Sequence, residues 1–143
     1  MKRNYTKILL RVAAGCLLFF AAGHSVGHFT RHDVNDPKAR EVLQIMTENK
    51  FDMFGQMRSY DENYTGMSLN LIFILFSFSV ILWLMSGYTK ENKQLVSNLL
   101  IPILVCVAGF TITGYLYFFI VPSITCLLAS IFILLSIILL KRE

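Results

Sequence analysis

Four long apolar stretches constrain the fold of this chain more than any other feature of its sequence. They run from about 8 to 29, 66 to 86, 95 to 120 and 123 to 140. Each is about as long as the roughly 20 residues that a helix needs to cross a bilayer. The mean hydropathy of +0.59 is also too high for an ordinary soluble domain. The sequence therefore predicts an all-α, polytopic membrane protein, with four transmembrane helices in an antiparallel bundle and a single domain over 1–143.

The first apolar stretch has a second interpretation. A basic start, an apolar middle and the small residues Ala21-Ala22-Gly23 would also suit a secretory signal peptide. Against this, the apolar character continues through Gly27-His28-Phe29, and three more apolar stretches follow. We therefore expect a first membrane helix over about 8–29.

The distribution of charge predicts the orientation of the bundle. Residues 30–65 are net acidic, whereas the remaining polar ends and loops are mostly basic: Lys2, Arg3, Lys7, Arg11, Lys90, Lys93, Lys141 and Arg142, against Glu91 and Glu143. Because positive residues favour the cytoplasmic side, both termini are expected in the cytoplasm, with the chain in the plasma (bacterial inner) membrane. The net charge is +4, but the basic residues form no stripe with interleaved aromatics. The expected partner is therefore the lipid bilayer and not nucleic acid.

Residues 30–65 are expected to form an outer loop with some helix. Asp36-Pro37 suits an N-cap followed by proline at the first helical position. Apolar residues at helical spacing then predict an amphipathic helix from about 37 to 49, with a continuation to 58 and a bend at Gly55. Its apolar face would lie on the membrane surface or cap the bundle.

The end of this loop is expected to turn back into the membrane. Tyr60-Asp61-Glu62-Asn63-Tyr64-Thr65-Gly66 reads as a polar, aromatic turn, and Ser68 as the cap of the second membrane helix. The three cysteines, Cys16, Cys106 and Cys126, all lie inside apolar stretches without a CxxC pair, so we expect them to behave as small apolar side chains.

Every histidine of the chain lies near the outer end of the first apolar stretch. His24, His28 and His32 are four residues apart and would stack along one helix face. With Arg11 at the inner surface, His24 lies about 20 Å along the helix, in the outer part of the hydrocarbon. An ionisable group at that depth is costly without a partner, so His24 and His28 are the candidate site.

Three interpretations of this pair stay open. His24 and His28 could ligate a metal, with a third ligand from His32, Asp33, Asp61 or Glu62. Haem is a variant of this interpretation, although two histidines on one helix face cannot both be axial ligands of one haem iron. They could act as catalytic acid and base on a lipid-soluble small molecule, oriented by a carboxylate such as Glu62 or Asp61. They could instead be structural, bonding to neighbouring helices or to the turn.

Small residues accompany the histidines. Gly23 and Gly27 form a GxxxG pattern, which would let another helix pack closely, either within the chain or in a homo-oligomer or membrane-protein partner. Further polar residues could converge on the same end: Ser68, Asn70, Thr111, Thr113, Tyr115, Tyr117, Arg58, Tyr60, Asp61, Glu62 and Tyr64. The sequence names no cofactor and leaves open whether the chain is an enzyme.

The motif Gly23-His24-Ser25-Val26-Gly27-His28 resembles that of an uncharacterised family of small bacterial four-helix integral membrane proteins. Further short matches follow along the chain: Met46, Phe54-Gly55, Arg58-Ser59, Gly66, Phe118-Phe119 and Pro122. The resemblance implies a bacterial inner-membrane protein with four helices and implies no activity. We therefore expect a membrane protein of unassigned activity with an outward-facing polar site, or alternatively a membrane-embedded enzyme.

Overall fold

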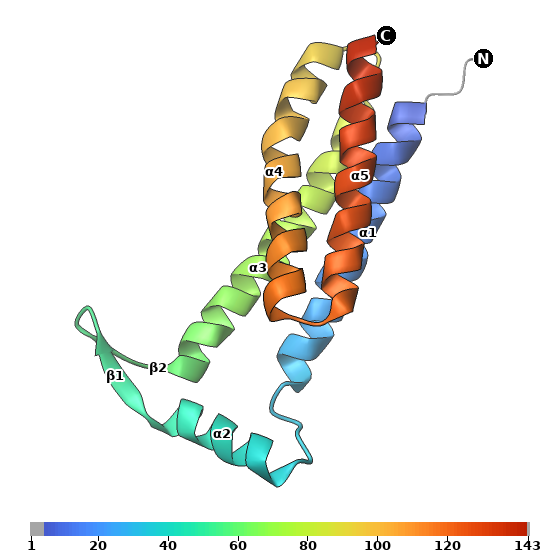
Figure 1. The fold of residues 1–143 in the computed structure, drawn as a ribbon. Helices are drawn as coiled ribbons and strands as arrows, with labels where there is room; N and C mark the ends of the chain where they lie inside the picture. The colour runs from blue at the N-terminus through green and yellow to red at the C-terminus, as the bar shows by residue number, and fades with distance from the viewer. Residues whose placement is uncertain (1–4, 143) are drawn as a thin grey trace. The chain divides into compact units, whose positions relative to one another are not determined.

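The computed structural model describes residues 5–142 and is almost wholly helical (Figure 1). Its elements, in chain order, are α1 (Tyr5–Thr30), α2 (Pro37–Glu48), β1 (Lys50–Met53), β2 (Gln56–Ser59), α3 (Tyr60–Met85), α4 (Lys93–Tyr117) and α5 (Ile120–Arg142).

Four of these helices, α1, α3, α4 and α5, are long and apolar enough to cross a membrane, with hydropathies of 1.7, 2.2, 2.3 and 2.7. Large apolar side chains remain exposed along them, including Phe19, Phe73, Val105 and Leu134. Contact of such a surface with lipid is favourable, whereas its exposure to water is unfavourable. The chain is an integral membrane protein that contacts the bilayer, and the prediction of an all-α bundle with four membrane helices is confirmed.

The described residues divide into two compact units, each of which we treat separately. One contains the residues up to Phe20 and those from Leu75 onward, and the other is Ala21–Ile74. The helices α1 and α3 each continue from one unit into the other. A single domain over 1–143 therefore stays a prediction.

The first unit is held by an apolar core and a few polar contacts. Fully buried leucines and isoleucine line it: Leu10, Leu17, Leu75, Leu82, Leu100 and Ile133. The guanidinium of Arg11 stacks 4.5 Å from the ring centre of Trp83, and its Nε donates to Ser86 Oγ at 3.3 Å. Ser79 Oγ donates to the carbonyl of Ala14 at 2.8 Å, which also joins α3 to α1.

The last two helices form a tight antiparallel hairpin. The expected bounds, 95–120 and 123–140, are corrected to Lys93–Tyr117 and Ile120–Arg142, because Pro122 sits within the first turn of α5, where its missing N–H removes no helical bond. The two helices approach closely at Gly114, where an added Cβ would lie 2.8 Å from Ser123 Oγ.

The segment between the first two membrane helices, residues 31–59, departs from expectation after α2. The helix begins as predicted, with Asp36 Oδ1 accepting from the Ala39 N–H at 2.8 Å, and it ends at Glu48. The predicted continuation to 58 is wrong, because β1 and β2 pair there as an antiparallel hairpin. Phe54 and Gly55 make its two-residue turn, both at positive φ (55° and 86°).

The second membrane helix starts earlier than predicted. The expected turn over 60–66 is helical, so α3 begins at Tyr60. Its start is a capping box, in which Ser59 Oγ accepts from the Glu62 N–H at 3.1 Å and Glu62 Oε2 accepts from the Ser59 N–H at 2.8 Å. Ser59, and not Ser68, is therefore the cap.

Candidate functional site

The candidate site lies within the unit Ala21–Ile74, where the end of α1 meets the start of α3. On α1, His24 and His28 share one face, and Arg31 follows the helix directly on the same side. On α3, Asp61, Thr65 and Ser68 also share a face, since they are separated by four and three residues. The early start of α3 is what brings these three side chains opposite the histidines.

The two histidines meet at one serine. Ser68 Oγ lies 2.9 Å from His24 Nε2 and 2.9 Å from His28 Nδ1. Ser68 and His28 are buried, with 5% and 8% of their surfaces exposed. A hydroxyl has one proton to donate and lone pairs to accept, so it can donate to one ring nitrogen while accepting from the other.

Arg31 sets the direction of this hydrogen-bond chain. Its Nη1 lies 3.4 Å from His28 Nδ1, and a guanidinium can only donate. Because this nitrogen faces a donor, we assign Nδ1 of His28 as an acceptor, whose one lone pair is shared by Arg31 Nη1 and the Ser68 hydroxyl. In this assignment Ser68 Oγ accepts from His24 Nε2–H, so each donor points along the chain from His24 through Ser68 toward His28.

Above this chain lies a charged cluster around Asp61. Arg31 Nη2 donates to Asp61 Oδ1 and Oδ2, each at 3.1 Å, and its Nε donates to Oδ1 at 3.2 Å. His32 Nε2 lies 3.0 Å from Asp61 Oδ1, and Arg31 Nη2 also donates to Thr65 Oγ1 at 2.6 Å. The guanidinium of Arg31 lies 5.6 Å from the ring centre of Tyr64. Opposite charges thus neutralise each other here, and the arginine is held where it can reach His28.

The structure pairs Asp61, and not Glu62, with the histidine-bearing segment. Glu62 belongs to the capping box and lies 3.6 Å from Lys50 Nζ and 4.0 Å from Arg58 Nη1 through its Oε1. The predicted catalytic role of Glu62 stays a prediction, and every contact just named holds the hairpin to α3.

The two glycines of the histidine motif are open within this unit. In Ala21–Ile74, no atom lies within 4 Å of where a Cβ would stand on Gly23 or Gly27. Their predicted role in helix packing stays a prediction. Within this unit, neither glycine has another helix packed against its Cβ position.

In this arrangement no third metal-ligating side chain joins His24 and His28. Among residues 5–142, no three His, Cys, Asp or Glu side chains converge in a way that could hold an ion. The nitrogens of His24 and His28 that approach each other both face Ser68 Oγ. The arrangement fits hydrogen bonding between the rings and the hydroxyl. It also fits proton transfer, which requires a continuous series of N–H and O–H groups.

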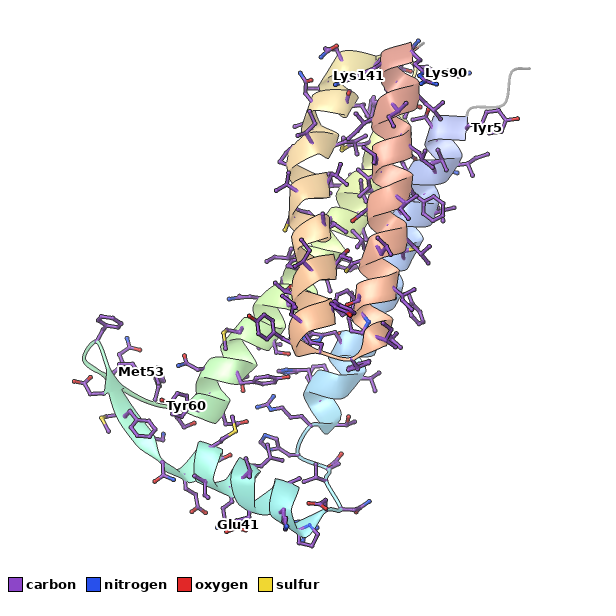
Figure 2. The ribbon with its side chains drawn as sticks, viewed as in Figure 1. Tyr5, Glu41, Met53, Tyr60, Lys90 and Lys141 are labelled. Atoms are coloured by element: carbon purple, nitrogen blue, oxygen red, sulfur yellow. The ribbon has the colours of Figure 1, made fainter. Side chains whose placement is uncertain are left out.

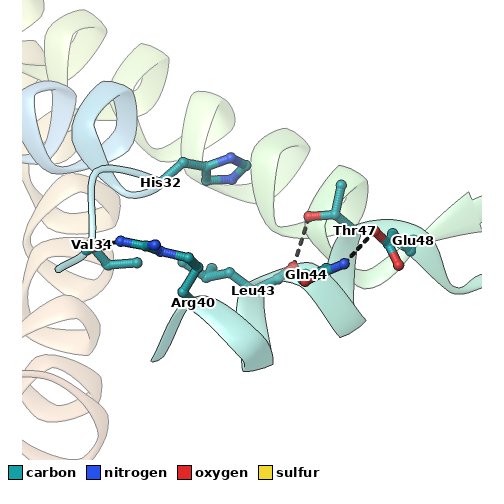
Figure 3. A pocket seen from close by; sticks show the side chains of 7 residues that line it. All are labelled: His32, Val34, Arg40, Leu43, Gln44, Thr47 and Glu48. Carbon is teal, nitrogen blue, oxygen red and sulfur yellow. Dashed lines mark hydrogen bonds between the residues drawn. The ribbon is translucent and has the colours of Figure 1, made fainter. Parts of the chain in front are cut away.

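A small groove lies beside the charged cluster (Figure 3). It has a volume of about 240 Å³ and is open to the surface; its lining comes from His32, Val34, Arg40, Leu43, Gln44, Thr47 and Glu48. Arg40 Nη2 donates to the carbonyl of Val34 at 3.1 Å, so two of the lining residues are hydrogen-bonded to each other. Ligand pockets usually enclose roughly 300–1,000 Å³, so this groove alone is too small and open to serve as one.

Sequence reasoning did not single out Arg31 or Thr65. It placed Ser68 among the polar residues that could converge on this end, but also took it as the cap of the second membrane helix. The signal that could have found them is the S-x-x-E pattern of Ser59 and Glu62, a capping box that sets the start of α3. With that start, helical periodicity alone places Thr65 and Ser68 on the face of Asp61.

No family model, no curated protein and no solved structure matches this chain. The fold defines it as an integral membrane protein with four membrane helices, and its own side chains are the basis for any functional proposal.

Proposed function

We propose that this chain is a bacterial inner-membrane protein that binds the hydrogen-bonding head of a lipid-soluble small molecule at its outward-facing end. Both termini lie in the cytoplasm in this proposal, as the basic inner segments favour. The observation that carries it is the sharing of Ser68 Oγ by His24 and His28, at 2.9 Å each.

The location of these groups supports a ligand that arrives from the membrane. His24 and His28 belong to an apolar membrane helix, where polar side chains are costly and commonly mark sites of function. His24 is only partly buried, while His28 and Ser68 behind it are buried. A polar head that enters from lipid would meet His24 first and find an oriented donor and acceptor set.

The test is to identify what the protein retains on purification from native membranes. Native mass spectrometry and organic extraction would be compared for the wild type, His24→Leu and Ser68→Ala, with His32→Leu as the control histidine outside the Ser68 chain. We expect a bound apolar small molecule in the wild type and in His32→Leu, and at least a tenfold loss in the other two, which corresponds to about 1.4 kcal/mol of binding. The same bound species at equal occupancy in all four proteins would contradict the proposal.

A second candidate function is acid–base catalysis on such a molecule. The observation that favours it is the continuous N–H and O–H chain: as His24 takes a proton from the bound molecule on Nδ1, its Nε2 proton could pass through Ser68 to Nδ1 of His28. Catalysis would appear as a difference between the species bound to the wild type and the species bound to His24→Gln. The two would differ in mass, or they would be isomers that differ in the position of a proton. Identical bound species in the two proteins would leave binding alone as the function.

A further inference from the structure

The tip of the β1–β2 hairpin carries an apolar residue in an unfavourable conformation. Phe54 has φ 55°, in the left-handed region that glycine, asparagine and aspartate adopt readily and bulky residues avoid. Its exposure is 107% of the reference value, so its ring gains no burial within the described residues. Both the backbone conformation and the exposed ring are costly in water, and burial of the ring by something outside the described residues would offset that cost.

The hairpin is firmly attached to the first turn of a membrane helix. Glu62 caps the Ser59 N–H at 2.8 Å and pairs with Lys50 at 3.6 Å, so one α3 side chain holds both strands. The rings of Phe51 and Tyr60 lie 5.2 Å apart. These contacts connect both strands of the hairpin to the first turn of α3.

This attachment sets where the tip lies relative to the lipid. A strand of four residues extends about 13 Å, so Phe54 lies within that distance of the first turn of a helix that crosses the bilayer. The hairpin, with Met53 near its tip, runs out to the side of the first turns of α3 and does not continue along the axis of that helix (Figures 1 and 2). Since membrane helices lie close to the bilayer normal, a sideways hairpin follows the interface.

The rest of the outer segment has the same unpartnered apolar character. None of the residues of α2 is buried, and Val42 and Ile45 on its apolar side are each 55% exposed. Met57 on β2 is 57% exposed. These side chains add to the exposed apolar surface of this unit, and aromatic residues such as Phe54 are favoured at the membrane interface.

We propose that the β1–β2 hairpin is a membrane-interface anchor, which inserts Phe54 into the lipid surface beside α3. The occupant of this apolar tip is the bilayer that α3 itself crosses. The anchor would hold the outer segment flat on the membrane next to the histidine site, and it does not depend on the function proposed for that site.

The test places a fluorescent reporter at the tip. The single native tryptophan is first replaced (Trp83→Phe), and Phe54→Trp is compared with Glu41→Trp, an exposed polar position on α2, in vesicles of phosphatidylcholine with or without bromine near the headgroup end of the acyl chains. We expect brominated lipid to quench the Phe54→Trp reporter, whose emission is shifted to shorter wavelength, and to leave Glu41→Trp bright and accessible to iodide.

Each other outcome overturns the proposal. Iodide quenching of Phe54→Trp without bromine quenching would place the tip in water. A short-wavelength emission with neither quencher effective would place it against a protein partner or a second copy of the chain. Equal bromine quenching at both positions would show that the tip is no special anchor. Should the Trp83→Phe background fail to fold, broadening of the Phe54 and Gly55 amide signals by nitroxide-labelled lipid, relative to Glu41, gives the same decision in the unmodified protein.

Discussion

At the scale of single residues, the bond network of Ser68 decides how the histidines behave. A serine placed between two rings lets each ring influence the proton position of the other, and the charge of Arg31 breaks the symmetry. The two histidines therefore act as one hydrogen-bonded unit, although the sequence shows them as separate residues one helical turn apart.

Replacement of Ser68 by alanine should uncouple this unit. We expect Ser68→Ala to lower the free energy of unfolding by about 1 kcal/mol, the size of an interhelical hydrogen bond in a membrane protein. Its matched control is Ser25→Ala, because Ser25 Oγ donates only to the Ala21 carbonyl of its own helix, at 2.8 Å. The measurement is unfolding by sodium dodecyl sulfate titration in bicelles.

The nitrogen-15 chemical shifts of the rings give a readout that stability alone does not. In the wild type, His28 should carry its proton on Nε2 and keep Nδ1 as an acceptor, and Ser68→Ala should shift the Nδ1 signal of His28 while Ser25→Ala leaves it unchanged. A His28 ring protonated at Nδ1 in the wild type would contradict the direction that Arg31 imposes.

At the scale of elements, the α4–α5 hairpin depends on one small residue. Gly114 allows Ser123 to approach until its Oγ donates to the Thr111 carbonyl at 3.3 Å. A larger side chain at position 114 would meet this serine and push the helices apart.

Gly114→Leu should therefore destabilise the hairpin by about 1–3 kcal/mol, the usual cost of overpacking. The control is Gly109→Leu on the same helix, since no atom lies within 4 Å of a Cβ at Gly109. Thermal unfolding in lipid nanodiscs would compare the two variants. Equal losses from both would show that helix packing at Gly114 is not the cause.

The helices and their bounds show which parts of the structure the sequence can predict. Hydropathy was enough for α1, α3, α4 and α5, because a bilayer demands long apolar helices whatever their partners. It failed over 50–66, where local hydrogen bonds decide: the Asp52 Oδ1 that accepts from the Gly55 N–H at 2.7 Å closes the hairpin turn. Phe54-Gly55 lacks the Asn-Gly or Asp-Gly of a typical turn, so the pattern was easily read as a helix with a bend.

The candidate site was predictable only on its α1 side. The spacing of His24 and His28 is visible in the sequence, whereas their partner depends on where α3 begins. Because the predicted start of that helix was six residues too late, Asp61, Thr65 and Ser68 were not recognised as sharing a face. Asp61 and Ser68 were named as possible partners, but Glu62 was favoured over Asp61.

At the scale of the whole molecule, orientation is the property that most affects function. Only with the termini in the cytoplasm does the histidine site open toward the outer side of the membrane. The proposal rests on the basic residues Lys90, Lys93, Lys141 and Arg142 at one end of the helices and the acidic outer segment at the other.

Reporter fusions test this orientation directly. A fluorescent protein fused after Glu143 should fluoresce, because its fold forms in the cytoplasm, and alkaline phosphatase fused after Asn49 should be active, because it requires the oxidising outer side. Exchange of the two reporters is the control and should abolish both signals. The reverse pattern would move the histidine site to the cytoplasmic face and contradict its proposed outward-facing placement, although entry from the lipid would remain open.

The short connection between α4 and α5 has a consequence for how the protein is made. Only Phe118 and Phe119 separate the two helices, which leaves no length of chain with which one could enter the bilayer and wait for the other. The two helices are therefore expected to enter the bilayer as a pair. A chain that ends at Tyr117 would lack Ser123, which packs against Gly114, so quality control would encounter this protein as half of a hairpin and not as a bundle lacking one helix.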